Sequence, residues 1–360
     1  MSTPRIEINL KKIIHNATAL NKLYASRGID IIAVTKAVCG NPIIAQALVE
    51  SGIKILADSR ISNIKRMRKA NVRAKFLLLR TPFMSQIHDV VKYVDISLNT
   101  ELAVLRKLSE VALKQKLEHQ IILMVELGDL REGILPEHLD GMVEKVLKLK
   151  GIKLVGLGAN LACFGGVKPD DKNMNYLSFL AEEIEKKFRI KLKFISGGNS
   201  ANYEWFSSSK NVQRINSLRI GESIFLGSNP LNSKPISGMF TNAFSLVLEV
   251  IESKNKVSVP YGEIHQNSFG VIPKFNNQGL MNRVILGAGS QDVTVSGLIP
   301  EIDIEVLRAS SDHLIVNGKT NELKIGEEVR FQLNYNALVS AMNSHYVTKY
   351  ISKHECERIL

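Results

Sequence analysis

The chain has 360 residues and a mean hydropathy of +0.01, with 45% hydrophobic and 23% charged residues, which predicts a globular protein with a buried core. No apolar run approaches the roughly 18 residues needed to span a membrane, which argues against a membrane protein. The net charge of +12 comes from lysines and arginines spread among glutamates, with only 6% aromatic residues, which argues against a nucleic-acid surface and favours a solvated basic one.

The first segments predict a strand over residues 5–10 and a helix over residues 11–24. The N-terminus lacks the apolar region of a secretory signal. The three cysteines, Cys39, Cys163 and Cys356, are far apart and odd in number, which argues against a disulfide framework. We therefore expect a cytoplasmic protein.

From residue 30 to about 227, short apolar runs alternate with amphipathic segments. The apolar runs predict eight buried parallel strands, over residues 31–35, 53–57, 75–79, 93–98, 120–127, 152–158, 192–196 and 214–220. The segments between them predict helices, over residues 42–51, 59–70, 84–91, 100–116, 137–148, 170–187 and 200–207. Asn41 and Asn99 are expected N-caps of two of these helices. This alternation favours a (β/α)8 TIM-type barrel over a doubly wound sheet, which seldom contains eight regular units.

The pattern changes after Gly227. Residues 228–235 read as a linker rich in Asn, Ser and Pro, and short strands separated by turns follow it, with one helix over residues 337–343. We therefore expect two domains, a barrel over residues 1–230 and a C-terminal β-rich domain over residues 231–360. The N-terminal strand is a candidate member of the β-rich domain.

Lys36 directly follows the first predicted barrel strand. A lysine at the mouth of a buried strand is desolvated, which favours its neutral amine, and a neutral amine can form a Schiff base with a carbonyl substrate or with pyridoxal phosphate. On this stretch alone, a solvated lysine at a strand end is the simpler interpretation.

Two glycine-containing turns lie where this fold usually binds phosphate, after the seventh and eighth strands. Gly197, Gly198, Asn199 and Ser200 follow the seventh strand, so their backbone N–H groups are expected to form an anion-binding nest, and Gly221 follows the eighth. Arg219 ends the eighth strand beside these turns. It is expected either to pair with a carboxylate such as Glu222 or to face the ring nitrogen of a cofactor.

Taken together, these features resemble the alanine-racemase-like (fold type III) pyridoxal-phosphate enzymes, and among them the ornithine racemases. The resemblance extends through both expected domains in order. It is carried by residues 33–40, 126–133, 160–166, 197–202, 218–222, 259–263 and 333–338.

The resemblance implies a role for several residues. Lys36 is implied to hold pyridoxal phosphate as a Schiff base and to act as one catalytic base, and Arg219 to face the pyridine nitrogen. The implied phosphate site combines Asn199 and Ser200 with the backbone of Gly221 and Glu222. Tyr335, with Tyr350 as the alternative, is implied to complete it from the second domain. Arg131 is implied to lie beside the cofactor and the substrate carboxylate, with Asp292 as a further substrate-binding candidate.

Racemisation needs a second acid–base group on the opposite face of the α-carbon. In alanine racemases this group is a tyrosine of the partner subunit, in a Val-Pro-x-Gly-Tyr run. Here the run ends in Glu263, and Cys39 and Gly40 stand where those enzymes place another tyrosine after the lysine. The candidates for the second base are therefore Glu263, Tyr261, Asp292 and Cys163.

We therefore expect an isomerase, a pyridoxal-phosphate-dependent racemase of ornithine or another basic amino acid. The resemblance also implies a homodimer whose active sites are shared between subunits. The alternatives are an alanine or broad-specificity racemase, a metal-dependent D-amino-acid lyase, and a non-catalytic pyridoxal-phosphate carrier. His354 and Cys356 are only two candidate zinc ligands, whereas a zinc site needs three or four, so no metal is expected.

Overall fold

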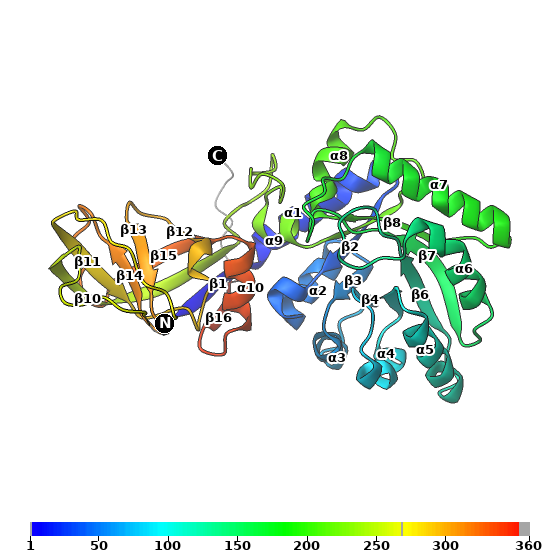
Figure 1. Cartoon of the computed structure of the whole chain (residues 1–360), viewed down its shortest axis with the longest axis horizontal. Coiled ribbons are helices and arrows are strands. Elements are labelled where there is room, and N and C mark those ends of the chain that lie inside the picture. The colour runs from blue at the N-terminus through cyan, green and yellow to red at the C-terminus, as the bar shows by residue number, and fades with distance from the viewer. Residues whose placement is uncertain (1, 268, 353–360) are drawn as a thin grey trace. The chain divides into compact units, whose positions relative to one another are not determined.

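The computed structural model describes residues 2–267 and 269–352, and eight parallel strands within these ranges close into a barrel (Figure 1). The barrel closes because the last strand pairs with the first, with Ile32 in register with Arg219. The barrel strands are β2 (Asp30–Val34), β3 (Ile55–Asp58), β4 (Lys75–Leu78), β5 (Ile96–Asn99), β6 (His119–Met124), β7 (Ile152–Gly158), β8 (Phe194–Asn199) and β9 (Ser217–Ile220). The predicted (β/α)8 barrel is confirmed.

Helices surround these strands and connect them (Figure 1). They are α1 (Leu10–Ala25), α2 (Pro42–Glu50), α3 (Ile61–Lys69), α4 (Ile87–Tyr93), α5 (Leu102–Lys114), α6 (Pro136–Leu147), α7 (Asp171–Phe188), α8 (Tyr203–Ser208) and α9 (Glu222–Leu226), with the 3-10 turns η1 (Lys36–Val38), η2 (Met84–Gln86) and η3 (Ser200–Asn202). The expected N-cap Asn41 is confirmed, since its Oδ1 accepts the N–H of Ile43 at 3.0 Å. The expected N-cap Asn99 is wrong, because its amide donates to Ser97 inside the barrel.

The interior of the barrel is filled by apolar side chains from successive strands. Ile32 and Val34 of β2 pack there with Leu98, Ile122 and Met124, and all of them are buried. Because side chains alternate along a strand and register partners share a face, Arg219 extends from β9 into the same interior as Ile32. A charged residue is thus held in an otherwise apolar core, close to its carboxyl end.

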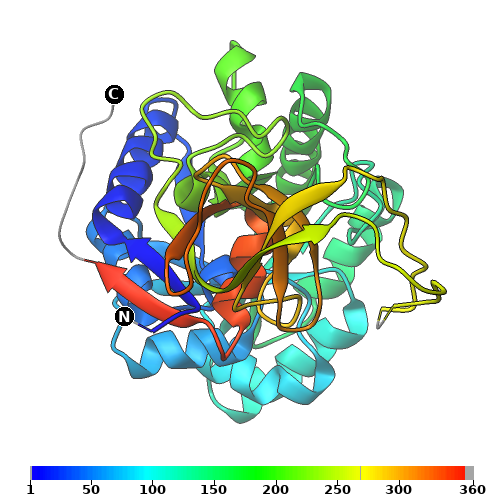
Figure 2. The same cartoon turned by 90° about the vertical axis from the view of Figure 1, so that its left-hand side faces the viewer.

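A second unit is built on an eight-stranded sheet, which confirms the expected β-rich region. Its path runs β12-β15-β10-β11-β14-β13, while β1 pairs antiparallel with β10 and parallel with β16 (Figure 2). Its elements are β1 (Arg5–Asn9), β10 (Phe244–Val257), β11 (Leu280–Leu286), η4 (Val295–Gly297), β12 (Leu298–Pro300), β13 (Glu305–Ala309), β14 (Leu314–Asn317), β15 (Glu328–Leu333), α10 (Tyr335–Asn343) and β16 (Thr348–Ser352). The N-terminal strand belongs to this sheet.

The two units divide the chain after Thr241, whereas the sequence indicated a division after residue 230. Residues 231–241 stay with the barrel because of specific hydrogen bonds. Asn16 of α1 donates to the carbonyl of Phe240 at 2.8 Å and accepts its N–H at 2.8 Å, and the N–H of Ile236 bonds to the carbonyl of Gly227.

Several predicted boundaries are corrected by local contacts. The strand expected over residues 93–98 begins only at Ile96, because Tyr93 ends α4 and the Asp95 carboxylate accepts the N–H of Phe76. The strand expected over residues 120–127 ends at Met124, where its ladder with β7 also ends at Gly158. The sequence did not predict α9, β12 and β16, all of which are only three to five residues long.

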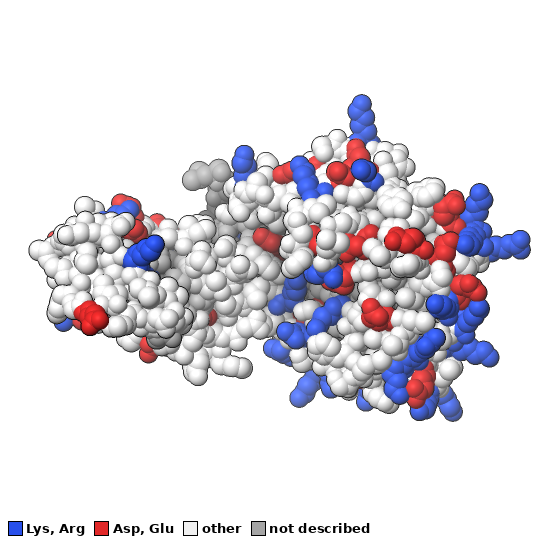
Figure 3. Space-filling model, in the orientation of Figure 1, with Lys and Arg blue, Asp and Glu red and all other residues white. Residues whose placement is uncertain are grey.

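On the face seen in Figure 3, lysines and arginines are scattered over the barrel with aspartates and glutamates among them. Within the described residues, no helix combines the length and apolar character that crossing a bilayer requires.

Candidate functional site

Lys36 lies at the carboxyl end of β2, separated from it by Thr35, and is the first residue of η1. Its side chain is exposed, which corrects the expectation of a desolvated amine. The reason is the local backbone. The turn of η1 buries Ala37 and Val38 beneath the lysine, so the lysine projects from the strand end and not into the core. A projecting amine is accessible to a ligand bound over the mouth of the barrel.

Three polar groups converge at the ends of β8 and β9. The Ser200 Oγ accepts the backbone N–H of Gly221 at 3.3 Å and that of Ser223 at 3.3 Å, and all three residues are buried. These two N–H groups belong to the start of α9, where unpaired donors favour anions. Both N–H groups are bonded to Ser200 Oγ, so the Ser200 O–H is the group of this cluster left to donate to an anion. We call Ser200, Gly221 and Ser223 the phosphate cradle, as a candidate site for a phosphate group.

Gly221 is required in the cradle by a close approach of two strands. A Cβ added there would lie 3.0 Å from Val34 Cβ and 3.1 Å from the Val34 carbonyl oxygen. A larger residue would therefore push α9 away from β2.

In the backbone nest expected at residues 197–200, the N–H of Asn199 is already occupied. The Asn199 N–H donates to Asn202 Oδ1 at 3.0 Å, and Asn199 Oδ1 accepts the Ala201 N–H at 2.8 Å. The Asn199 amide donates to the Leu161 carbonyl at 2.8 Å and to Asn160 Oδ1 at 3.2 Å. Asn199 therefore ties the loop after β7 to the loop after β8.

Asn160 accepts a hydrogen bond from Asn199 and has a buried donor of its own. Its Oδ1 is occupied by Asn199, and its Nδ2 is buried without a hydrogen-bond partner among the residues that the structure describes. Buried amide donors in folded proteins are nearly always paired. The unpaired donor therefore fits a polar atom of a bound molecule at the mouth of the barrel.

Arg219 is buried, with 4% of its surface exposed. Its Nη1 donates to Ser196 Oγ at 2.5 Å and its Nη2 donates to the Ala159 carbonyl at 2.6 Å. Burial, together with the field of Arg131, lowers the pKa of Arg219 to about 10. The expected pairing with Glu222 is wrong, because the described residues provide Arg219 with neutral oxygens as hydrogen-bond acceptors. A buried cation without a bonded carboxylate suits an electron-rich ligand atom.

Arg131, on the loop after β6, is held by two neighbours. It forms an ion pair with Glu132, and its Nη1 donates to Cys163 Sγ at 2.6 Å. Burial is the largest single effect and opposes its charge, but the hydrogen bonds and charges of Glu132 and Cys163 together outweigh it, so the pKa of Arg131 is raised. The positive charge of Arg131 also lowers the pKa of Arg219, which indicates that both guanidinium groups lie at the same mouth of the barrel.

Asp129 supports this arrangement, a role that the sequence did not indicate. It is 1% exposed, and its carboxylate accepts the N–H groups of Cys163, Phe164 and Gly165 at 3.1 Å each. These bonds fix the loop after β7 against the loop after β6, and so place Cys163 beside Arg131. In the sequence, the one indication that Asp129 belongs to the site was its position between a predicted strand and Arg131.

Glu222 is the first residue of α9, and its backbone is adjacent to the cradle. Burial raises the pKa of its carboxyl to about 7, although the nearby Lys36 ammonium lowers it. Eight of the candidate site residues thus lie in the barrel unit: Lys36, Arg131, Cys163, Asn199, Ser200, Arg219, Gly221 and Glu222.

The remaining sequence candidates lie in the second unit. Tyr335 is the first residue of α10, and Tyr350 lies in β16. Tyr261 is 94% exposed in the loop between β10 and β11, where Glu263 is also exposed and lies 3.3 Å from His265. Asp292 is buried, and its Oδ2 accepts the Gly289 N–H at 2.9 Å, so its carboxylate stabilises its own turn.

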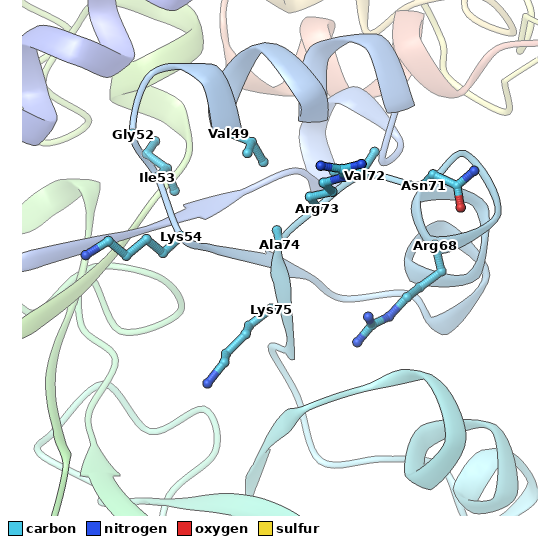
Figure 4. Close-up of a pocket in the computed structure, with 10 residues that line it drawn as sticks. All are labelled: Val49, Gly52, Ile53, Lys54, Arg68, Asn71, Val72, Arg73, Ala74 and Lys75. Atoms are coloured by element: carbon cyan, nitrogen blue, oxygen red, sulfur yellow. The ribbon is translucent and has the colours of Figure 1, made fainter.

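A hollow of about 910 Å³ lies away from this site, at the amino ends of β3 and β4 (Figure 4). Its basic residues are Lys54, Arg68, Arg73 and Lys75, and they surround the carboxyl ends of α2 and α3. Basic side chains are favourable at helix C-termini. Arg68 also forms an ion pair with Asp95, with 2.6 Å between Nη2 and Oδ2. The basic residues of the hollow are therefore accounted for by contacts within the barrel.

The two candidate zinc ligands, His354 and Cys356, lie outside the described residues. Within residues 2–267 and 269–352, no cluster of three or more His, Cys, Asp or Glu side chains has the arrangement of a metal site.

Comparison with known proteins places this geometry among racemases. A family described as "Alanine racemase, N-terminal domain" matches residues 8–229. An ornithine racemase of Acetoanaerobium sticklandii is 37% identical over 350 residues, which cover 96% of this chain and 99% of that protein. A lysine racemase of Thermotoga maritima is 38% identical over 351 residues, which cover 97% and 98%. A solved alanine racemase of Clostridium difficile 630 has a TM-score of 0.75 at 18% identity, over 98% of this chain and 96% of that one.

Proposed function

The chain belongs to the alanine racemase family and is a pyridoxal-phosphate-dependent amino-acid racemase, and from this premise we propose that its substrate is a basic amino acid, ornithine first and lysine second. The observation that carries the substrate is the full-length similarity to two racemases of basic amino acids. Both substrates are unbranched amino acids with a distal ammonium, and the side chain of lysine is one methylene longer than that of ornithine.

We propose that the residues at the barrel mouth hold the cofactor. The cradle of Ser200, Gly221 and Ser223 would bind its phosphate, with Asn199 positioning the loop and Glu222 contributing backbone. Arg219 would donate to the ring nitrogen, which explains a buried cation bonded only to neutral oxygens. Tyr335 stays our proposal for a contact from the second unit.

Bound pyridoxal phosphate supplies an electron sink that makes the α-proton of an attached amino acid acidic. The Lys36 Nζ would hold the cofactor and then take or return that proton on one face of the α-carbon. Arg131 would bind the substrate carboxylate, since a guanidinium matches a carboxylate in a two-point geometry. Its contacts with Glu132 and Cys163 fix its direction before substrate arrives.

The second acid–base group is one of four candidates, which are Cys163, Glu263, Tyr261 and Asp292. Cys163 is favoured by its place in the barrel unit beside Arg131. Glu263 and Tyr261 are favoured by their exposure on the β10–β11 loop, which makes them accessible to a second copy of the chain. Asp292 is the weakest choice, also for substrate binding, because its carboxylate is buried and bonded to Gly289.

We further propose a homodimer with active sites shared between subunits, located in the cytoplasm. The proposed dimer is supported by the exposed acid and phenol just described, and the location by three cysteines that are too widely spaced and odd in number for a disulfide framework. Sedimentation of the purified protein and fractionation of cells test these two statements.

The decisive experiment follows α-proton exchange and optical rotation in deuterated water. The protein loaded with pyridoxal phosphate is incubated separately with L-ornithine, L-lysine and L-alanine. We expect exchange and loss of rotation with ornithine and lysine, and at most about a tenth of that rate with alanine. Exchange with alanine alone would contradict the substrate. Lys36→Ala should abolish both exchange and the visible absorbance of the bound cofactor, with Lys54→Ala at the opposite end of the barrel as the control.

A further inference from the structure

Lys36 and Glu222 leave two neighbouring strands of the barrel at the same end. β2 and β9 are paired in parallel, with Ala33 in register with Ile220. Thr35 separates the end of β2 from Lys36, and Gly221 separates the end of β9 from Glu222. The tight contact between Gly221 and Val34 brings the two strand ends together.

Glu222 is half-buried, and within the described residues neither the Glu222 carboxyl nor the Lys36 ammonium has a hydrogen-bond or ion-pair partner. Other acids at this end of the barrel are already occupied. Asp58 accepts Thr35 Oγ at 2.8 Å and Asn63 Nδ2 at 3.0 Å, and Glu132 pairs with Arg131. Unlike Asp58 and Glu132, the Glu222 carboxyl has no such partner among the described residues, so it is available to act on the lysine.

We propose that Glu222 is the positioning carboxyl of Lys36, which accepts a proton from the lysine ammonium and stabilises that ammonium when it re-forms. In the transfer, an N–H bond of Lys36 Nζ breaks and an O–H bond forms on a Glu222 Oε atom, so the amine becomes neutral and the carboxylate becomes a neutral acid. The arrangement corresponds to a base oriented by a neighbouring carboxylate. This inference rests on the proposed role of Lys36.

The charges around Glu222 support an acid that ionises near neutral pH. From the β2 side, Lys36 is the charged group whose field reaches the carboxyl, and from η3 the neighbour is the uncharged Ser200. Arg219 of β9 extends into the barrel and contributes no field to it. Burial alone raises the carboxyl's pKa, to about 7, in spite of the lysine.

The test measures the loading of cofactor, without substrate. Full-length protein freed of cofactor is mixed with pyridoxal phosphate between about pH 5.5 and about pH 9, and the rate at which the absorbance of lysine-bound cofactor appears is recorded. The variants are Glu222→Gln, which keeps the shape without the charge, and Glu222→Asp, which keeps a carboxyl. Glu144→Gln, an exposed residue paired with Lys148 on α6, is the matched control.

We expect the wild-type rate to rise through an inflection near pH 7, and Glu222→Gln to lose the inflection and load about tenfold more slowly above it. Glu222→Asp should keep an inflection, and Glu144→Gln should match the wild type. If Glu222→Gln follows the wild-type profile within about twofold, Glu222 does not act on Lys36 and the proposed function still stands. If the wild type forms no lysine-bound cofactor at any pH, both proposals fail. Should Glu222→Gln not fold, the wild-type profile decides, because a wild-type rate without an inflection near about pH 7 contradicts the inference.

Discussion

The Nη2 atom of Arg219 donates a hydrogen bond to the carbonyl oxygen of Ala159 at 2.6 Å. Ala159 directly follows β7 and Arg219 lies in β9, so the guanidinium extends past β8 and joins three strand ends below the mouth. Its other terminal nitrogen donates to Ser196 of β8. A buried cation in such a place is costly unless a ligand uses it, and this cost leads to the first prediction.

Arg219→Met should separate the functional role of the arginine from its structural role. Loss of the buried charge relieves desolvation, whereas loss of the hydrogen bonds leaves the Ala159 carbonyl unpaired. The two effects oppose each other, so the free energy of unfolding of the cofactor-free protein should change by less than about 1.5 kcal/mol. Affinity for pyridoxal phosphate should fall at least about tenfold. Denaturant unfolding and cofactor titration measure the two quantities, and a large loss of stability with unchanged affinity would show a purely structural arginine.

Ser200→Ala tests the phosphate cradle. The variant removes the hydroxyl that accepts the Gly221 and Ser223 N–H groups. One hydrogen bond to a charged phosphate is worth roughly 1.5–3 kcal/mol, so the dissociation constant for pyridoxal phosphate should rise about tenfold or more. Binding of pyridoxal, which lacks the phosphate, should be unchanged. An equal loss for both molecules would mean that Ser200 supports the fold and does not bind phosphate.

Asp129→Ala should loosen the loop that carries Cys163. Three backbone N–H groups lose their buried acceptor, which should lower the free energy of unfolding by about 2–4 kcal/mol. Arg131 then loses a fixed partner, so KM for the amino acid should rise more than kcat falls. Asp140→Ala, which removes an exposed partner of Lys187, is the control and should cost less than about 0.5 kcal/mol. An unchanged KM in Asp129→Ala would separate this loop from substrate binding.

His119 should make the barrel sensitive to acid. It is 2% exposed, its Nε2 lies 2.8 Å from Ser97 Oγ, and burial lowers its pKa to about 4 from the ordinary value of 6.5. Between these two values the unfolded chain binds the proton more tightly, so stability is complete above about pH 6.5 and falls as the pH is lowered. The loss should reach about 3 kcal/mol by pH 4.

Urea unfolding of the wild type and His119→Asn across this range checks the prediction. The variant should lose that part of the pH dependence, whereas His138→Asn, an exposed residue of α6, should keep it. Parallel curves for wild type and His119→Asn would contradict it.

Much of the architecture was readable from the sequence because it depends on local patterns. Continuous apolar runs such as residues 121–125 identify strands buried on both faces, and their alternation with amphipathic segments is enough to predict a barrel. Lys36 and Arg219 were found for the same reason, since a polar residue at the carboxyl end of such a strand stands out. Short elements such as α9 were missed because five residues carry no periodicity.

The sequence by itself determined the barrel, the β-rich unit and the strand ends that carry polar residues, because these follow from hydrophobic periodicity along the chain. Only the tertiary structure decided which groups are free. It showed that the Asn199 N–H is occupied by Asn202, that Asp129 holds the loop of Cys163, and that the half-buried Glu222 lies within the field of Lys36. Hydrogen bonds and charge fields between residues far apart in the chain depend on the closure of the barrel, and no local pattern records them.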